Sequence, residues 1–375
     1  MKLKKFLPLL LTSFLVSGCT NSTDKIYIGG ILPMSGDYYY CGREIKNGVE
    51  LAISKRPKIL DKDIKFEVLD DDSDHIRNID AYNKFAANKK ICSIIGGGNS
   101  ILSEDIAANS QKNPLPIIVP SASLNSITEY GNNIYRVGFN DEIQGTCMAK
   151  FALTDLNLKT AAVLYDSENN YSVELAKSFA DTFNQNGGNV LILQKHATLD
   201  SDFRIELNKI KPFNPDVLFV PDYAYNAVLI AKQARDIGIQ SVILGSDTWE
   251  EAITQTSNPN DLEGIYFCTH YSVDNPNAEI QNFVNDYETN YKSTPSSFAA
   301  LGFDSANILL DAIIDAKSTQ MDEILNSLAK TNYSGITGQI NFDSNHNPIK
   351  AVTIVKISGG KNNFIKVFNI NKEAL

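Results

Sequence analysis

The stretch TAAVLYDSENNYSVELAKSFADTFNQNG (160–187) contains one strand–helix unit that recurs along the chain. Its opening residues, 160–165, form a short apolar run that is typical of a strand buried on both faces. In 172–186 the apolar side chains fall at helical spacing, and Gly187 is a common type of helix end. The helical set consists of Val173, Ala176, Phe179, Ala180 and Phe183. A strand followed by an amphipathic helix is the building unit of a parallel α/β sheet.

Similar units lie on both sides of this stretch. Further apolar runs predict strands over 26–32, 64–69, 91–96, 115–119, 189–194, 216–220 and 241–245. A second amphipathic helix is indicated over 224–237, where Gly238 ends the pattern. Alternation of strand and helix predicts parallel sheets with helices on both faces. The pattern restarts near residue 140, so we expect two similar α/β lobes and not one large sheet.

The C-terminal part has a different pattern. Helical spacing continues through 279–292, 299–317 and 321–330. Residues 336–343, 350–357 and 364–369 then alternate in polarity around Asn345–Pro348 and Gly359–Gly360. This arrangement predicts antiparallel strands joined by tight turns.

Composition excludes several classes of protein. The chain has 375 residues, of which 43% are hydrophobic and 21% charged, so it is globular and long enough for two domains. Its net charge of −10, with no long basic run, argues against nucleic acid as a partner. The mean hydropathy is −0.18, and a single stretch near the N-terminus is apolar enough to enter a bilayer, which excludes a polytopic membrane protein.

The first residues have the features of an export signal. MKLKKFLPLLLTSFLVSGC (1–19) combines a positive start, an apolar segment over 6–16 and small residues before Cys19. A cysteine at this point resembles the bacterial lipobox, in which the chain is cut before the thiol and the thiol is acylated. We therefore expect a signal peptide over 1–18, lipidation of Cys19 and a polar tether over 19–23; a plain signal peptide or a single membrane anchor is the alternative.

The remaining cysteines and the histidines carry little local signal. An exported protein can form disulfides, and Cys41, Cys92, Cys147 and Cys268 allow three pairings that the sequence does not distinguish. Cys92 and Cys268 lie in strand-like runs, where a buried free thiol is at least as plausible. The four histidines are far apart in the sequence, which favours surface or loop positions over a metal site.

Common catalytic and nucleotide-binding motifs are absent from the sequence. It contains no phosphate loop, no GxSxG, no HExxH and no CxxC. Gly96–Gly98 follow a strand, but the third glycine of a dinucleotide fingerprint is replaced by Ile101. The sequence therefore predicts no cofactor, no metal and no catalytic residue.

Small polar groups follow three strands of the first predicted lobe. They are Pro33–Gly36, Gly96–Ser100 and Pro120–Ser123. Ligands of open parallel sheets bind beyond the carboxyl ends of the strands. Hydroxyls beside the free N–H groups of a following helix suit a carboxylate. The alternative is that Ser100 and Ser123 only cap helices.

The second lobe provides groups of opposite character. Tyr223 follows strand 216–220 together with Asp222, and Asp247 follows strand 241–245. An aspartate at a strand end can hold an ammonium group, and a tyrosine ring can form a pocket wall. A helix cap near 248–254 is the alternative role for Asp247. A carboxylate receptor facing an ammonium receptor predicts a site for an α-amino acid.

Taken in order, these segments resemble those of the type I periplasmic binding proteins, in the branch of the leucine/isoleucine/valine-binding proteins of bacterial ABC importers. The resemblance rests on IYIGGILPMSGDYYYCGREIKNGVELA (26–52), IIGGGNSILSEDIA (94–107), IIVPSASLNSIT (117–128) and AAVLYDSENNYSVELAKSF (161–179), and it covers nearly the whole mature chain. It implies two Rossmann-like lobes joined by a three-strand hinge. Lobe 1 would comprise 24–141 plus 271–336, and lobe 2 would comprise 142–270 plus 337–375.

The resemblance also implies which residues contact the ligand. The matching positions are Ser100, Ser121, Ser123, Tyr171, Tyr223, Asp247 and Phe298. Ser100 would hold the carboxylate, and Ser121 and Ser123 the carboxylate and the ammonium group. Asp247 would hold the ammonium group, and the aromatic rings would form the walls around the side chain. Cys41 stands where the family commonly has a tyrosine, Asp247 where it has Glu, and Ser172 where it has Gly. These departures are compatible with amino-acid recognition but weaken the case for branched-chain specificity. Tyr38–Tyr40 either lie at the cleft mouth or form an exposed loop.

The expected function is therefore that of a monomeric lipoprotein at the periplasm or cell surface. It would capture an amino acid or similar zwitterion between its lobes and deliver it to the permease of an ABC importer. A ligand sensor of the same fold for a signalling partner is the first alternative, and an enzyme that uses the cleft is the second.

Overall fold

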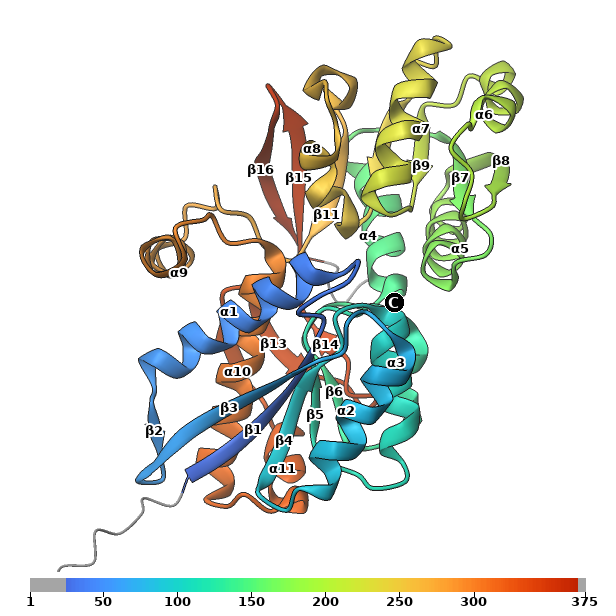
Figure 1. Ribbon diagram of the computed structural model, residues 1–375. Helices are drawn as coiled ribbons and strands as arrows, with labels where there is room; N and C mark the ends of the chain where they lie inside the picture. Colours follow the sequence, from blue (N-terminus) through green and yellow to red (C-terminus); the bar gives the residue numbers. More distant parts are fainter. Residues whose placement is uncertain (1–24, 370–375) are drawn as a thin grey trace, which may run out of the picture.

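The computed structural model describes residues 25–369, which form two α/β lobes, each built around a sheet (Figure 1). The expected signal peptide, tether and lipidation at Cys19 fall outside these residues and stay predictions.

The sheet of lobe 1 has six strands in the order β2-β3-β1-β4-β5-β6. All neighbours are parallel except β2 and β3, which pair antiparallel. The strands are β1 (Lys25–Leu32), β2 (Lys58–Ile59), β3 (Lys62–Asp70), β4 (Ile91–Gly96), β5 (Ile117–Val119) and β6 (Ile134–Arg136).

The sheet of lobe 2 has seven strands in the order β16-β15-β11-β10-β9-β7-β8. Strands β7 to β11 are parallel, while β15 pairs antiparallel with both β11 and β16. The strands are β7 (Thr160–Asp166), β8 (Asn189–His196), β9 (Val217–Val220), β10 (Val242–Gly245), β11 (Tyr266–Thr269), β15 (Val352–Ser358) and β16 (Lys361–Phe368).

The two lobes repeat one topology. In lobe 1 the parallel strands run β3-β1-β4-β5-β6, and in lobe 2 they run β8-β7-β9-β10-β11. Each sheet thus places its first strand between its second and third. In each lobe, successive strands are added first on one side of the first strand (β1 or β7) and then on its other side. Open α/β sheets bind ligands at such switch points. The predicted fold of two Rossmann-like lobes is confirmed.

Helices cover both faces of each sheet. Those of lobe 1 are α1 (Tyr39–Lys55), α2 (His75–Ala87), α3 (Ser100–Ser110), η1 (Asn125–Tyr130), α9 (Ala278–Tyr291), α10 (Ser297–Ala316) and α11 (Met321–Leu328). Those of lobe 2 are α4 (Asp141–Thr154), α5 (Asn170–Gln185), α6 (Arg204–Ile210), η2 (Lys211–Phe213), α7 (Ala224–Asp236), η3 (Asp247–Glu251), α8 (Ala252–Gln255) and η4 (Pro259–Leu262).

Helix α10 packs unusually close to α1, because glycine lies at the crossing on both helices. A Cβ on Gly48 would lie 2.0 Å from the carbonyl oxygen of Ala299, and one on Gly302 would lie 2.3 Å from that of Ile45. The crossing fixes the N-terminus of α10 at the upper end of lobe 1 (Figure 1). The sequence predicted a single stretch apolar enough for a bilayer, near the N-terminus. Among the described helices, α10 is also long and apolar enough to cross a membrane, but most of it is buried inside the protein.

Three connections link the lobes. They follow β6 at 137–140, β11 at 270–277 and β14 at 350–351. The sequence predicts the third between residues 336 and 337. A small sheet of β12 (Tyr333–Gly335), β13 (Gly338–Phe342) and β14 (Pro348–Ile349) intervenes, and Ile340 of β13 packs in the core of lobe 1. We therefore draw the last crossover near Lys350.

Lys350 ties these connections together. Its Nζ donates to Thr337 Oγ1 at 2.6 Å and lies 3.4 Å from the carbonyl oxygen of Val137. Burial lowers the pKa of Lys350 to about 7. The hinge region thus contains a buried amine, and its surroundings disfavour the protonated form of that amine.

Candidate functional site

A cavity of about 420 Å³ lies between the lobes. Its walls come from the loops after β1, β4 and β5 in lobe 1 and after β7, β8, β9, β10 and β11 in lobe 2. The cavity therefore lies at the carboxyl ends of the strands, as the sequence predicted for the ligand. All the predicted contact residues line it, namely Ser100, Ser121, Ser123, Tyr171, Tyr223, Asp247 and Phe298. Their contact with a ligand stays a prediction.

The wall from lobe 1 presents hydroxyls. Ser100 is the first residue of α3, and its Oγ accepts a hydrogen bond from the backbone N–H of Leu124 at 3.3 Å. The alternative role as a cap is wrong for Ser100, because the side chain of Asn99 caps α3. Ser121 is 7% exposed, and its Oγ has no hydrogen-bond partner among the described residues.

One expectation about this wall needs correction. Ser35, in the first predicted strand end, does not line the cavity, because its Oγ lies 2.6 Å from carboxylate oxygens of both Asp70 and Asp72. The chain reaches the cavity later, at Asp37, Tyr38, Tyr40 and Cys41. Tyr39 of the triple tyrosine does not line it and is largely exposed.

The wall from lobe 2 is aromatic and acidic. The rings of Tyr171 and Tyr223 stack with their centroids 5.3 Å apart. The Tyr171 hydroxyl donates to Asp247 Oδ1 at 2.7 Å and lies 2.8 Å from Ser246 Oγ. Asp247 is further fixed by its backbone N–H, which donates to Gln144 Oε1 at 3.1 Å. The carboxylate of Asp247 faces these groups and does not cap a helix, so that alternative is wrong.

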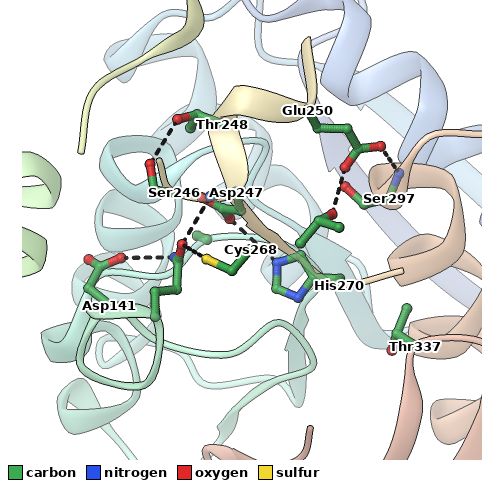
Figure 2. A network of polar contacts seen from close by, with 12 residues as sticks. Asp141, Ser246, Asp247, Thr248, Glu250, Cys268, His270, Ser297 and Thr337 are labelled. Carbon is green, nitrogen blue, oxygen red and sulfur yellow. Dashed lines mark hydrogen bonds and ion pairs between the residues drawn. The ribbon is translucent and has the colours of Figure 1, made fainter. Parts of the chain in front are cut away.

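A buried histidine lies beside Asp247 (Figure 2). His270 Nε2 is 3.5 Å from Asp247 Oδ2, which is too long for a strong hydrogen bond. Burial lowers the pKa of His270 to about 4, although Asp247 opposes this shift, and the ring stacks on Phe139 at 3.7 Å. His270 is therefore neutral near pH 7 and leaves the charge of Asp247 uncompensated. His270 lies in the loop after β11, as expected for the histidines, although it is buried. His196 is a buried residue at the end of β8, which contradicts its expected surface or loop position.

Two glutamates of the site were missed at the level of sequence. Glu250 accepts from the backbone N–H of Ser297 at 2.8 Å and from Thr269 Oγ1 at 2.8 Å, so it joins lobe 2 to lobe 1 (Figure 2). Glu251 lines the cavity, and burial together with neighbouring carboxylates raises its pKa to about 7. The available signal was the run of acids after a strand end, Asp247 to Glu251, which we had interpreted through Asp247 alone.

The lobes meet at a second point on the cleft. The backbone N–H of Asn125 in lobe 1 donates to Glu174 Oε2 of α5 in lobe 2 at 3.3 Å. Phe298 and Tyr40, both of lobe 1, lie edge to face with centroids 6.5 Å apart. The structure is thus one in which the two lobes touch across the site.

Cysteine and metal chemistry receive no support within residues 25–369. Cys41, Cys92, Cys147 and Cys268 are all buried free thiols, so none of the possible disulfides is present. Cys41 instead donates from Sγ to the carbonyl oxygen of Gly98 at 2.8 Å. No group of three or more His, Cys, Asp or Glu side chains in this range could hold a metal ion.

Comparison with known proteins places the chain in a family. The family model of the periplasmic binding proteins matches residues 25–362. A crystal structure of the leucine-binding protein LivK from Thermotoga maritima is 32% identical, covers 92% of this chain and 99% of that one, and superposes with a TM-score of 0.84. The chain belongs to the periplasmic binding proteins, and the predicted resemblance to the type I, Leu/Ile/Val-binding branch is confirmed.

Other relatives agree with this assignment. The branched-chain amino acid substrate-binding protein LivJ of Streptococcus pneumoniae, solved with isoleucine, is 28% identical with a TM-score of 0.81 and covers 91% of this chain and 99% of its own. The Leu/Ile/Val-binding protein BraC3 of Rhizobium johnstonii is 27% identical over 59% of this chain. That match spans about three-fifths (61%) of the Rhizobium protein.

Proposed function

We propose that this protein is an extracytoplasmic solute-binding lipoprotein that captures an amino acid between its lobes and delivers it to an ABC importer. The observation that carries the proposal is the opposition of two walls in one cavity, hydroxyls on lobe 1 and the uncompensated carboxylate of Asp247 on lobe 2. Names of relatives support the same solute class, since LivJ was solved with isoleucine and LivK is a leucine-binding protein.

The energies are adequate for such a role. Micromolar affinity requires about −8 kcal/mol. Hydrogen bonds to the charged ends of a zwitterion contribute about 1.5–3 kcal/mol each, and burial of its side chain against Tyr223 and Phe298 adds to them. The solute would first bind lobe 1, and only the closed state offers both walls, so binding shifts the population toward closure. The permease would then recognise the closed shape.

The lipoprotein part rests on the sequence around Cys19. Expression of the full chain in a bacterial host should place it in the membrane fraction, and mass spectrometry should detect an acylated N-terminal cysteine. Cys19→Ala should release the protein from the membrane fraction. An unmodified Cys19 would contradict the anchor without affecting the binding proposal.

The binding part is tested by identifying what the cavity holds. Native mass spectrometry of the purified full chain should detect a co-purifying amino acid, and a thermal-shift screen of amino acids followed by calorimetry should reproduce its binding. Failure of every α-amino acid to bind would overturn the proposed function. Turnover of a bound metabolite, lost in Asp247→Asn, would instead support an enzyme.

A further inference from the structure

The cavity is lined by an excess of carboxylates. The acidic residues on its walls are Asp37, Asp166, Asp222, Asp247, Glu250 and Glu251. No lysine or arginine is found among the described residues that line it. A zwitterion needs one carboxylate partner for its ammonium group, so the cavity holds more negative charge than a neutral amino acid can match.

Most of these carboxylates already have partners in the protein. Asp166 accepts from Thr198 Oγ1 at 2.7 Å, and Asp222 Oδ2 lies 2.8 Å from His196 Nε2. Glu250 accepts one bond from Thr269 in its own lobe and one from Ser297 N–H of lobe 1, which joins the lobes. Asp37 lies on the exposed rim. These four are therefore explained without a ligand.

Glu251 is the exception. Its side chain is half-buried and makes no hydrogen bond or ion pair with the described residues. It lies near Cys41 across the cleft, since its charge adds to burial in raising the pKa of the Cys41 thiol. A partly desolvated carboxylate without a partner is costly unless a cation binds it. The cavity also contains two buried polar atoms without a hydrogen-bond partner among the described residues, Ser121 Oγ and His270 Nδ1.

Glu251, together with Asp247, whose protein partners are neutral, indicates what kind of ligand the cavity fits. Asp247 and Glu251 are the first and last residues of η3. A 3₁₀ helix rises about 2 Å per residue, so their backbones lie about 8 Å apart along its axis and their side chains meet the cavity at two separate points. Two separate carboxylates suit a solute that carries two amino groups, as a diamino acid does. Tyr40 and Phe298 line the same cavity and offer ring faces to an alkyl stem or a cation.

We infer that the solute is a basic amino acid, of the lysine, ornithine or arginine class, whose side-chain cation binds Glu251 while its α-ammonium group binds Asp247. This inference rests on the proposed function and narrows its solute class. Ser100, Ser121 and the N-terminus of α3 would hold the α-carboxylate, so no basic residue is needed in the wall.

The test compares lysine with norleucine, which has the same stem length and ends in a methyl group. Calorimetry on the full chain at pH 8 should give an affinity for lysine about tenfold or more above that for norleucine. Glu251→Gln should reduce lysine affinity by about tenfold or more and change norleucine affinity by less than about twofold. Glu323→Gln, an exposed glutamate of α11 far from the cavity, should change neither.

Each other result of these binding measurements overturns one of the statements made above. Norleucine or leucine binding as tightly as lysine would overturn this inference and leave the proposed function standing. An equal loss of lysine and norleucine affinity in Glu251→Gln would assign Glu251 a structural role and overturn its contact with the side chain. Cadaverine binding as tightly as lysine, or no binding by any α-amino acid, would overturn the amino-acid assignment itself and with it this inference.

Discussion

The two walls of the cleft have the same topological origin and opposite chemistry. Both follow the carboxyl ends of parallel strands in sheets of one strand order. The wall of lobe 1 is built from serine hydroxyls, a glycine turn and the start of α3, and its acid Asp37 lies at the exposed rim. The wall of lobe 2 is built from tyrosine rings and carboxylates.

The difference shows how one fold copied twice can orient a small dipolar solute. A helix start with hydroxyls favours a negative group, and Asp247 beside a neutral His270 favours a positive one. Neither wall alone offers both. A zwitterion is therefore held in one orientation, and both of its ends are satisfied only when the lobes are together.

The largest expected effect comes from removing the carboxylate of Asp247, which would bind the ammonium group of the solute. Asp247→Ala should reduce affinity for any α-amino solute at least about tenfold and up to about a hundredfold, because a hydrogen bond to a charged group contributes about 1.5–3 kcal/mol. The fold should survive, since Asp247 is partly exposed on the short helix η3. Calorimetry on the purified protein measures the change.

The matched control for this variant is Asp236→Ala, an exposed aspartate of α7 in the same lobe that pairs with Lys232. It should bind like the wild type. Unchanged affinity in Asp247→Ala would mean that the ammonium group binds elsewhere and that the contrast between the walls does not govern orientation.

The second prediction concerns how much the buried carboxylate of Glu251 destabilises the folded protein. The pKa of Glu251 is about 7 in the folded protein and 4.5 ordinarily, so the folded state binds its proton more tightly than the unfolded state. Stability of the ligand-free protein should therefore fall as pH rises from about 4.5 to about 7. The upper bound is about 3 kcal/mol, and solvent screening of this half-buried group reduces it to about 1–2 kcal/mol.

Glu251→Gln removes the destabilisation that comes from ionisation of this side chain. Its melting temperature should exceed that of the wild type by several degrees at pH 8 and match it near pH 4.5. Differential scanning calorimetry at the two pH values measures the difference. An equal gain at both pH values would show that packing, and not the charge of Glu251, is responsible.

The sequence predicted those features that depend on local pattern. The apolar runs located β1, β4, β7 and β9 within about two residues, and the restart of the pattern near residue 140 separated the lobes. Ser100, Ser123 and Asp247 could be chosen because strand ends of a parallel sheet converge, so position in the strand–helix repeat already implies position in space.

Features that depend on side chains from distant segments could not be predicted. Glu250 lies in the site because it meets the start of α10, whose position is set by the glycine crossing with α1. His270 is buried because three connections pack around it, and the sequence around a histidine does not encode that burial. The small sheet of β12 to β14 was predicted only in part. β13 lies within the strand expected over 336–343, but it pairs with the short strands β12 and β14 beside lobe 1.

The third prediction separates binding from structure within the serine wall. Ser121 Oγ makes no well-formed hydrogen bond with the described residues, although it opposes the rise in the pKa of the neighbouring Cys41 thiol. Ser121→Ala should therefore remove chiefly a ligand contact. Affinity should fall about fivefold, from the loss of about 1 kcal/mol, with an unchanged melting temperature. Ser100→Ala should reduce both, because Ser100 Oγ also accepts from Leu124 N–H. Calorimetry and thermal unfolding of the two variants side by side test this, and a loss of stability in Ser121→Ala would contradict it.

The smallest expected effect concerns the contact between the walls themselves. Glu250 is held by Thr269 in its own lobe and by the backbone N–H of Ser297 in the other, so it stabilises the closed arrangement without touching the solute's charged ends. Glu250→Gln keeps the shape and weakens both bonds, because hydrogen bonds to a charged acceptor are stronger than neutral ones. Affinity should fall about threefold through a smaller closed population, and small-angle X-ray scattering without ligand should give a larger radius of gyration.

Glu174→Gln is the matched control for that variant, since Glu174 also bridges the lobes but through a longer bond of 3.3 Å to Asn125 N–H. Its effect on the radius of gyration should be smaller. If both variants keep the wild-type dimensions while Glu250→Gln still binds more weakly, Glu250 acts through the cavity's charge and not through closure. The hinge, including Lys350 and its bonds to Thr337 and Val137, would then hold the lobes together without help from the cleft.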